Sequence, residues 1–167
     1  IDKMKEVFCD IFSVKLDDPL WYDLDSLSVK SITEFKDYHG VNVTIDAYLD
    51  RTKIQVSIDV GFGDVIYPKR VVMDFPVILS EENPRVYAYS LSSSIAEKFE
   101  AIVSLGYDNS RFKDFYDIYI LSGKYDMDGS ELMEACKETF GHRHTSFYDI
   151  AAFEDDYASD PVRQSRW

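Results

Sequence analysis

Cysteine is scarce in this sequence of 167 residues. The two cysteines, Cys9 and Cys136, lie far apart and show no Cys-x-x-Cys spacing. They therefore give no disulfide framework, and a reduced, cytoplasmic protein is the simpler interpretation.

Long apolar runs are also missing. No stretch approaches the roughly 18 apolar residues of a membrane span. The N-terminal residues, which begin at Ile1 rather than Met, lack the basic and apolar pattern of a signal peptide. We therefore expect no membrane partner, and a processed or incomplete N-terminus.

Basic residues are few relative to acidic ones. The chain has 18 Lys and Arg against 31 Asp and Glu, a formal net charge of −13. This argues against a general nucleic-acid binder, which needs a basic surface to neutralise phosphates, but it leaves room for a small basic pocket. Hydrophobic residues make up 46% of the chain, which is enough for a packed core and excludes a disordered chain.

The N-terminal half combines one helix with strands. Apolar residues at helical spacing predict a helix over 1–13, and the acidic stretch 15–26 predicts a loop. Alternating apolar and polar residues predict two strands joined as a hairpin. The predicted strands cover 27–35, 41–49 and 54–60, with short strands or extended loop over 71–79 and 85–89.

The C-terminal half has the spacing of helices from Ser90 onward. Ser94 with Glu97 has capping-box spacing, although Ser92 or Ser93 could equally be the cap. The predicted helices cover about 94–105, 111–121 and 128–140, with a last helix around 150–157. A helix, then strands, then helices predict an α+β fold.

Asp59 is the first candidate for chemistry. If the hairpin turn centres on Arg51 and Thr52, Asp59 lies opposite Thr44 on the open face of the sheet. A strand carboxylate followed by glycines suits magnesium, which binds a few carboxylates together with substrate phosphates. A solvated polar-face carboxylate is the alternative, which the spacing alone favours for Asp59 and favours more strongly for Asp46.

Charged residues on two of the predicted helices form the second candidate. Lys98 lies among small and apolar residues, so it could reach a phosphate or simply extend to solvent. Asp114 and Asp117 are three residues apart and share one helical face, where they could also complement the helix dipole. The neighbouring Arg111 and Lys113 could pair with these acids or with phosphate oxygens.

Other signatures of chemistry are missing. The segment His142-Arg143-His144 fits no zinc spacing, so we interpret it as a solvated turn. No P-loop, GxSxG, HExxH or GxGxxG motif occurs.

Several segments, in this order, resemble the AbiEii-type nucleotidyltransferases. These are the toxins of type IV toxin–antitoxin and abortive-infection systems, within the polymerase-β-like nucleotidyltransferase superfamily. The resemblance covers about residues 38–145. It rests on Ser57 to Asp64, Ala88-Tyr89, Ile95 to Ala101, Ser110 to Asp117 and Thr139-Phe140.

The resemblance implies a role for each candidate residue. Asp59 matches the third metal-binding acid of the family, Lys98 its helix lysine, and Asp114 and Asp117 its later paired acids. The family's Gly-Ser turn and Asp-x-Asp pair are expected before the first helix, so this chain is expected to begin after them. The implied fold is a mixed or antiparallel nucleotidyltransferase-like sheet over 1–90, followed by a helical part over 91–167 that packs against it.

The implied activity is magnesium-dependent transfer of a nucleotide from a nucleoside triphosphate to an RNA, tRNA included, or to a protein. Asp59 would hold metal in a two-magnesium site that needs the missing Asp pair. Lys98 would neutralise triphosphate charge, with Arg111 and Lys113 as further substrate contacts and Asp114 or Asp117 as positioning acids. The alternative is an inactive nucleotidyltransferase-like binding module with a basic partner such as a cognate antitoxin, or a plain acidic interaction domain.

Overall fold

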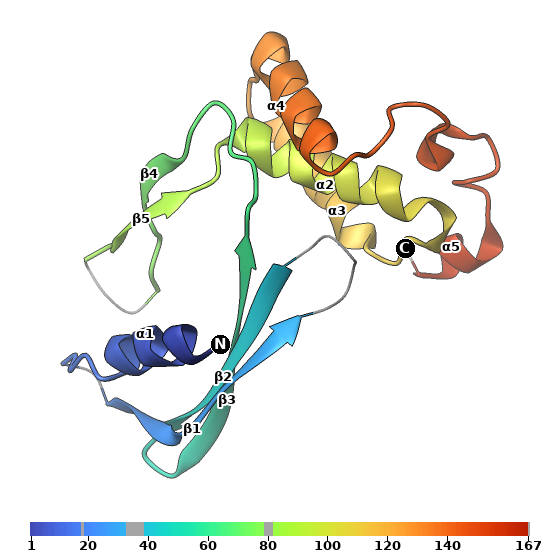
Figure 1. Cartoon of the computed structure of the whole chain (residues 1–167). Helices are drawn as coiled ribbons and strands as arrows, with labels where there is room; N and C mark the ends of the chain where they lie inside the picture. The colour runs from blue at the N-terminus through green and yellow to red at the C-terminus, as the bar shows by residue number, and fades with distance from the viewer. Residues whose placement is uncertain (18, 33–38, 79–81, 167) are drawn as a thin grey trace. The chain divides into compact units, whose positions relative to one another are not determined.

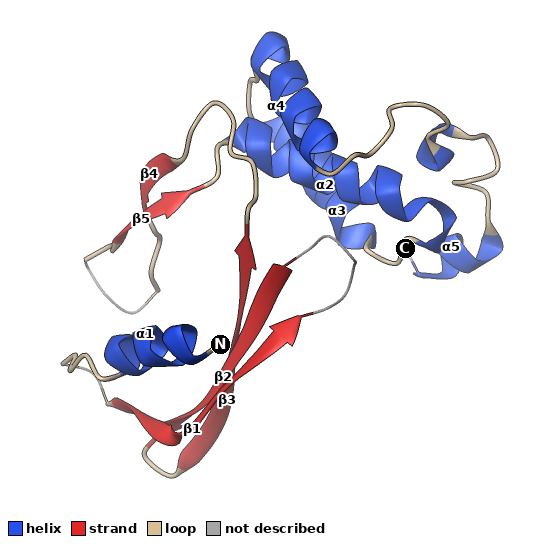
Figure 2. Ribbon diagram, in the orientation of Figure 1, coloured by secondary structure: helices blue, strands red, loops and turns tan. Residues whose placement is uncertain are grey.

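The computed structural model describes residues 1–17, 19–32, 39–78 and 82–166 (Figure 1). The chain divides into two compact units, Ile1–Asp64 and Val65–Trp167, and each is described by itself. Helices and antiparallel strands both occur (Figure 2), so the predicted α+β class is confirmed.

The first unit is a three-stranded antiparallel sheet with one helix. Its order is β1-β2-β3, so the predicted hairpin supplies the central strand and one neighbour. Helix α1 confirms the helix predicted over 1–13. The elements are α1 (Asp2–Phe12), β1 (Leu20–Ile32), β2 (His39–Leu49) and β3 (Thr52–Phe62).

The loop predicted over 15–26 is wrong in its second half, because β1 already begins at Leu20. The register of β1 against β2 shifts between Asp23 and Ser28, which marks a bulge. A bulge breaks the two-residue alternation, so this strand has no regular sequence pattern. The predicted end of the strand at Phe35 lies outside the described residues.

The hairpin turn lies one residue earlier than predicted. Leu49 pairs with Thr52, so Asp50 and Arg51 form the turn, and Asp50 adopts a positive φ of 52°. Aspartate tolerates this left-handed conformation better than most residues. Asp59 therefore pairs with Asn42, and the predicted pairing with Thr44 is wrong.

The sheet has one apolar face and one polar face. On β2 the residues Val41, Val43 and Ile45 are buried, and they cluster with Phe8 of α1. The residues between them are half-buried and polar, which is the alternation of a strand with one covered face. Asp59 pairs with one of these polar positions, so it lies on the face opposite α1.

The second unit begins with a small hairpin and continues as helices. β4 and β5 pair antiparallel, which confirms the short strands predicted there; Leu79 is outside the described residues. Helix α2 contacts both α3 and α4. The elements are β4 (Val71–Asp74), β5 (Arg85–Ala88), α2 (Leu91–Leu105), α3 (Phe112–Lys124) and α4 (Gly129–His142).

Helix α2 is capped by Ser90, and not by Ser92, Ser93 or Ser94 as predicted. The Ser90 side chain accepts a hydrogen bond from the backbone N–H of Ser93. The hydroxyls of Ser90 and Ser93 each donate to the carbonyl of Tyr67 at 2.7 Å, so the cap is held by tertiary contacts that sequence spacing does not show. Gly106 ends the helix with a positive φ of 50°, as predicted.

The helix predicted around 150–157 is wrong. This stretch holds only the short 3₁₀-helix η2 (Ala151–Phe153), and the last helix is α5 (Pro161–Arg166). Asp160 accepts hydrogen bonds from the backbone of Val162 and Arg163, and Pro161 takes the first helical position. The residues that start the last helix therefore lie after the acidic residues on which the prediction was centred. None of the described helices is long and apolar enough to cross a membrane.

Candidate functional site

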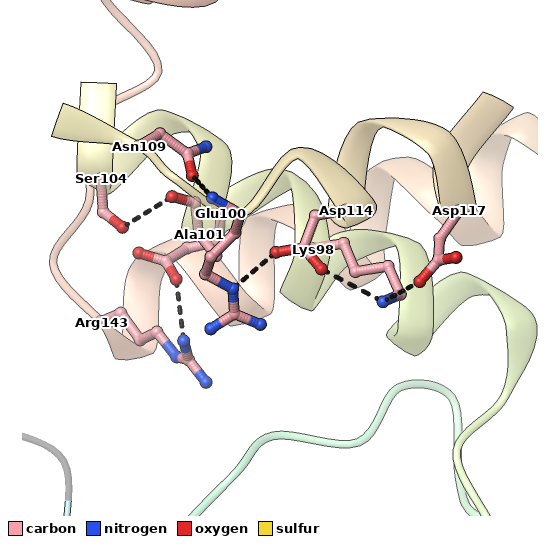
Figure 3. Close-up of polar contacts among 9 residues, drawn as sticks. Lys98, Glu100, Ala101, Ser104, Asn109, Asp114, Asp117 and Arg143 are labelled. Carbon is pink, nitrogen blue, oxygen red and sulfur yellow. Dashed lines mark hydrogen bonds and ion pairs between the residues drawn. The ribbon is translucent and has the colours of Figure 1, made fainter. Parts of the chain in front are cut away.

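Lys98 lies between two aspartates of the neighbouring helix (Figure 3). Its Nζ is 2.7 Å from Oδ2 of Asp117 and 3.2 Å from Oδ1 of Asp114. Residues three apart on a helix share one face, so α3 presents both carboxylates to the same side of α2. The structure therefore brings together three of the four residues predicted as catalytic.

Arg111 joins the same cluster through Asp114. Its Nε donates to Oδ2 of Asp114 at 2.8 Å, so both oxygens of that carboxylate are bound by cations. The side chain of Asp114 is 5% exposed, whereas that of Arg111 is 61% exposed. Asp114 is thus the buried centre of the cluster, and Arg111 faces solvent. Lys113, the other predicted substrate contact, is exposed.

These contacts keep the cluster charged. Partial burial of the Lys98 ammonium works against its charged form, but the hydrogen bonds to Asp117 and Asp114 outweigh it and raise the pKa of Lys98. The hydrogen bond from Lys98 also lowers the pKa of Asp117, against a smaller opposing effect of burial. The formal charges of Lys98, Arg111, Asp114 and Asp117 sum to zero.

A second ion-pair network, which the sequence did not predict, lies on another face of α2. Arg143, which caps the C-terminus of α4, donates to Oε2 of Glu100 at 2.9 Å (Figure 3). It also contacts Glu97. The interpretation of residues 142–144 as a solvated turn is therefore wrong for Arg143. The sequence shows only that Glu97 and Glu100 are three residues apart. The burial of Glu100, which calls for a cation partner, is visible only in the structure.

The turn before α3 is supported from the C-terminal helix. Arg163 of α5 is buried and donates to the carbonyls of Tyr107 and Asn109, while its guanidinium lies 4.0 Å from the ring centre of Tyr157. Asn109 in turn accepts a hydrogen bond from the backbone N–H of Arg111. Arg163 thus supports Arg111, at the start of α3, through Asn109. The two arginines are about fifty residues apart, and no sequence pattern indicates this link.

Asp59 has a different environment. The side-chain amide of Asn42 donates to its Oδ1 at 2.7 Å and to the hydroxyl of Ser57 at 2.8 Å. No described residue forms an ion pair with Asp59, so its charge is not cancelled by a cation. Asp46, on the same face, is instead paired with Lys53 at 2.6 Å.

The candidate carboxylates differ in their fitness for a metal. Asp59 offers a hard oxygen and an uncancelled charge, which suits magnesium, whereas Asp114 and Asp117 are already bound by cations. No group of three or more His, Cys, Asp or Glu in the described part of the chain could hold a metal. The described residues therefore supply one ligand and not a complete site.

The candidate residues lie in two separate units. Asp59 belongs to Ile1–Asp64, and the Lys98 cluster belongs to Val65–Trp167. Their convergence on one site stays a prediction, as does the packing of a part over 91–167 against a part over 1–90.

Comparison with known proteins gives one match. The family model described as nucleotidyl transferase AbiEii toxin, type IV TA system, matches residues 1–167, a wider range than the 38–145 covered by the motifs. No curated protein and no solved structure matches the chain. Because the match spans the whole sequence, the chain belongs to the AbiEii nucleotidyl transferase toxin family of type IV toxin–antitoxin systems.

Proposed function

We propose that this chain takes part in metal-dependent transfer of a nucleotide from a nucleoside triphosphate to an RNA or protein acceptor in the cytoplasm. The observation that carries the proposal is Lys98 held between Asp114 and Asp117, in the motif order of the family. In the reaction an acceptor hydroxyl attacks the α-phosphorus, loses its proton, and pyrophosphate leaves.

The candidate residues have separate roles in this reaction. Arg111 keeps its terminal guanidinium nitrogens toward solvent while Nε is held by Asp114, so it can donate to phosphate oxygens without leaving the cluster. Lys98 supplies a second fixed positive charge, and Asp117 and Asp114 set its position. Asp59 would hold magnesium, which neutralises phosphate charge and activates the hydroxyl when it is bound.

The test is transfer of labelled nucleotide to a pool of cellular RNA and protein by the full protein. Lys98→Ala and Asp59→Asn are each expected to reduce transfer by at least about 100-fold, as loss of a main electrostatic stabiliser does. Lys137→Ala is the matched control, because Lys137 forms only an exposed pair with Glu134 on α4. A fully active Lys98→Ala protein would overturn the site.

A second candidate is a binding module without catalysis. The internal neutralisation of Lys98 and the net charge of −13 favour a basic protein partner over a polyanion. The type IV family suggests an antitoxin as that partner. Salt-dependent binding of the antitoxin, together with no transfer by the full protein, would favour this function.

A further inference from the structure

The polar face of the first unit holds Asp59 in one orientation. Asn42 and Asp59 are register partners on β2 and β3, and Ser57 lies two residues before Asp59 on the same face. The amide nitrogen of Asn42 reaches both, at 2.7 Å to Oδ1 of Asp59 and 2.8 Å to Oγ of Ser57. An amide has two N–H groups, so one nitrogen can serve both acceptors.

The Asn42 side chain is an uncharged donor, and this matters for Asp59 as much as its position does. Asn42 lies in the register row between Lys30 of β1 and Asp59 of β3. A neutral amide orients a carboxylate but leaves its negative charge intact. The pair of Asp46 and Lys53 on the same face shows the other outcome, a carboxylate bound directly by a cation.

We propose that Asn42 is a positioning residue that binds Oδ1 of Asp59 and so leaves Oδ2 as the metal-binding oxygen. The inference rests on the proposed function, in which Asp59 is the metal ligand. Groups that hydrogen-bond a ligating carboxylate fix its direction, and their loss commonly lowers metal affinity by about 10- to 100-fold. Asn42 therefore contributes to metal binding without touching the metal, and Ser57 contributes by holding the amide.

The test measures metal binding directly, with no turnover. The full protein, carrying ¹³C-labelled aspartate side chains, is titrated with Mn²⁺, and paramagnetic broadening of the Asp59 carboxyl signal reports binding at that carboxylate. Asn42→Ala is expected to weaken binding about tenfold, toward the lower end for a group behind a metal ligand. Ser57→Ala is expected to have a smaller effect, because it removes only the second acceptor of the amide.

Thr44→Ala is the matched control. Thr44 lies on the same face of β2 and pairs with Ser57, but it forms no hydrogen bond with Asp59. It should leave Mn²⁺ affinity unchanged, and unchanged methyl signals of Val41 and Val43 show that each variant keeps the core of the sheet.

The outcomes separate this inference from the proposed function. Wild-type affinity in Asn42→Ala, with binding lost in Asp59→Asn, would overturn the role of Asn42 and leave Asp59 as the ligand. Wild-type affinity in Asp59→Asn, or no broadening of the Asp59 signal in the unmodified chain, would overturn the metal assignment itself, and with it this inference.

Discussion

Asp114 is the residue on which the charged cluster of the second unit depends. Its carboxylate is nearly inaccessible and is bound by Lys98 and Arg111, which come from either side of it. Asp117 shares Lys98 but is 24% exposed, so water can replace part of its contact. The two acids of the motif are therefore unequal in their structural roles.

Replacement of these acids tests that inequality. Asp114→Asn is expected to lower the free energy of unfolding by about 3 kcal/mol, because it removes the buried charge that both Lys98 and Arg111 bind. Asp117→Asn should cost about 1 kcal/mol, since its pair is closer to a surface salt bridge. Urea unfolding of both variants measures the difference, and equal losses would contradict the assignment of Asp114 as the centre.

The pKa shifts of the cluster predict how stability depends on pH. The pKa of Asp117 is lower in the folded protein, so its contribution is present above about pH 4, the ordinary range of an aspartate, and is lost as pH falls further. The pKa of Lys98 is raised, so its contribution is complete below about pH 10 and is lost as pH rises through the folded-state pKa.

The measurement is the difference in unfolding free energy between the wild type and Asp117→Asn. It should be constant between about pH 5 and pH 9 and shrink at both ends. A difference that grows as the pH falls below 4 would contradict the sign of the Asp117 shift.

Among the elements, α2 is the one to which α3 and α4 are attached by polar contacts. Lys98 connects it to α3, and Arg143 connects it to the end of α4 through Glu97 and Glu100. The hydroxyl of Ser92 adds a bond of 2.6 Å to Glu131 near the start of α4. Because α4 is held at both ends, its position on α2 is fixed by charge as well as by apolar packing.

Arg143 offers a test of that attachment. Arg143→Ala should destabilise the protein by about 3 kcal/mol, because it leaves the buried carboxylate of Glu100 without a cation. Added to Glu100→Gln, the same substitution should cost less, since the buried charge is gone and only the pair with the less buried Glu97 is lost. Thermal or urea unfolding of the two single variants and the double variant gives the coupling, and strict additivity would contradict a direct pair.

The elements also show what the sequence could and could not predict. β2, β3 and the cores of α1 to α4 follow from periodicity, because each buries one face and has a regular apolar repeat. The start of β1 does not follow, because a bulge interrupts the repeat. The cap of α2 was misplaced because three further serines offered equivalent local spacing, and only contacts with Tyr67 decide between them.

The candidate site was also partly predictable, because helical spacing fixes which residues share a face. Asp114 and Asp117 share a helical face by spacing alone, and the resemblance to the family implied that one of them positions Lys98, Arg111 or the acceptor. Arg143, Arg163 and Asn42 act through contacts between distant segments, which one sequence does not encode in any local pattern.

At the scale of the whole molecule, the prediction is that Asp59 and Lys98 serve one substrate. With Mn²⁺ and a nucleoside triphosphate bound, the metal at Asp59 should lie near Lys98, because both would contact one triphosphate chain. Paramagnetic broadening of the Lys98 side-chain signal measures this. The Lys137 signal on α4 is the control. Broadening at Asp59 with none at Lys98 would mean that the two groups do not share a site.

The zero net charge of the Lys98 cluster has a consequence for substrate binding. A triphosphate that reaches Lys98 and Arg111 meets cations whose counter-ions, the carboxylates of Asp114 and Asp117, are internal and stay bound, so it displaces few ions from solution. Its affinity should therefore fall less steeply with salt than affinity for two free cations would. The two carboxylates remain as neighbouring negative charges once the phosphates arrive. The cluster would then hold its substrate loosely, which favours release of the pyrophosphate after transfer.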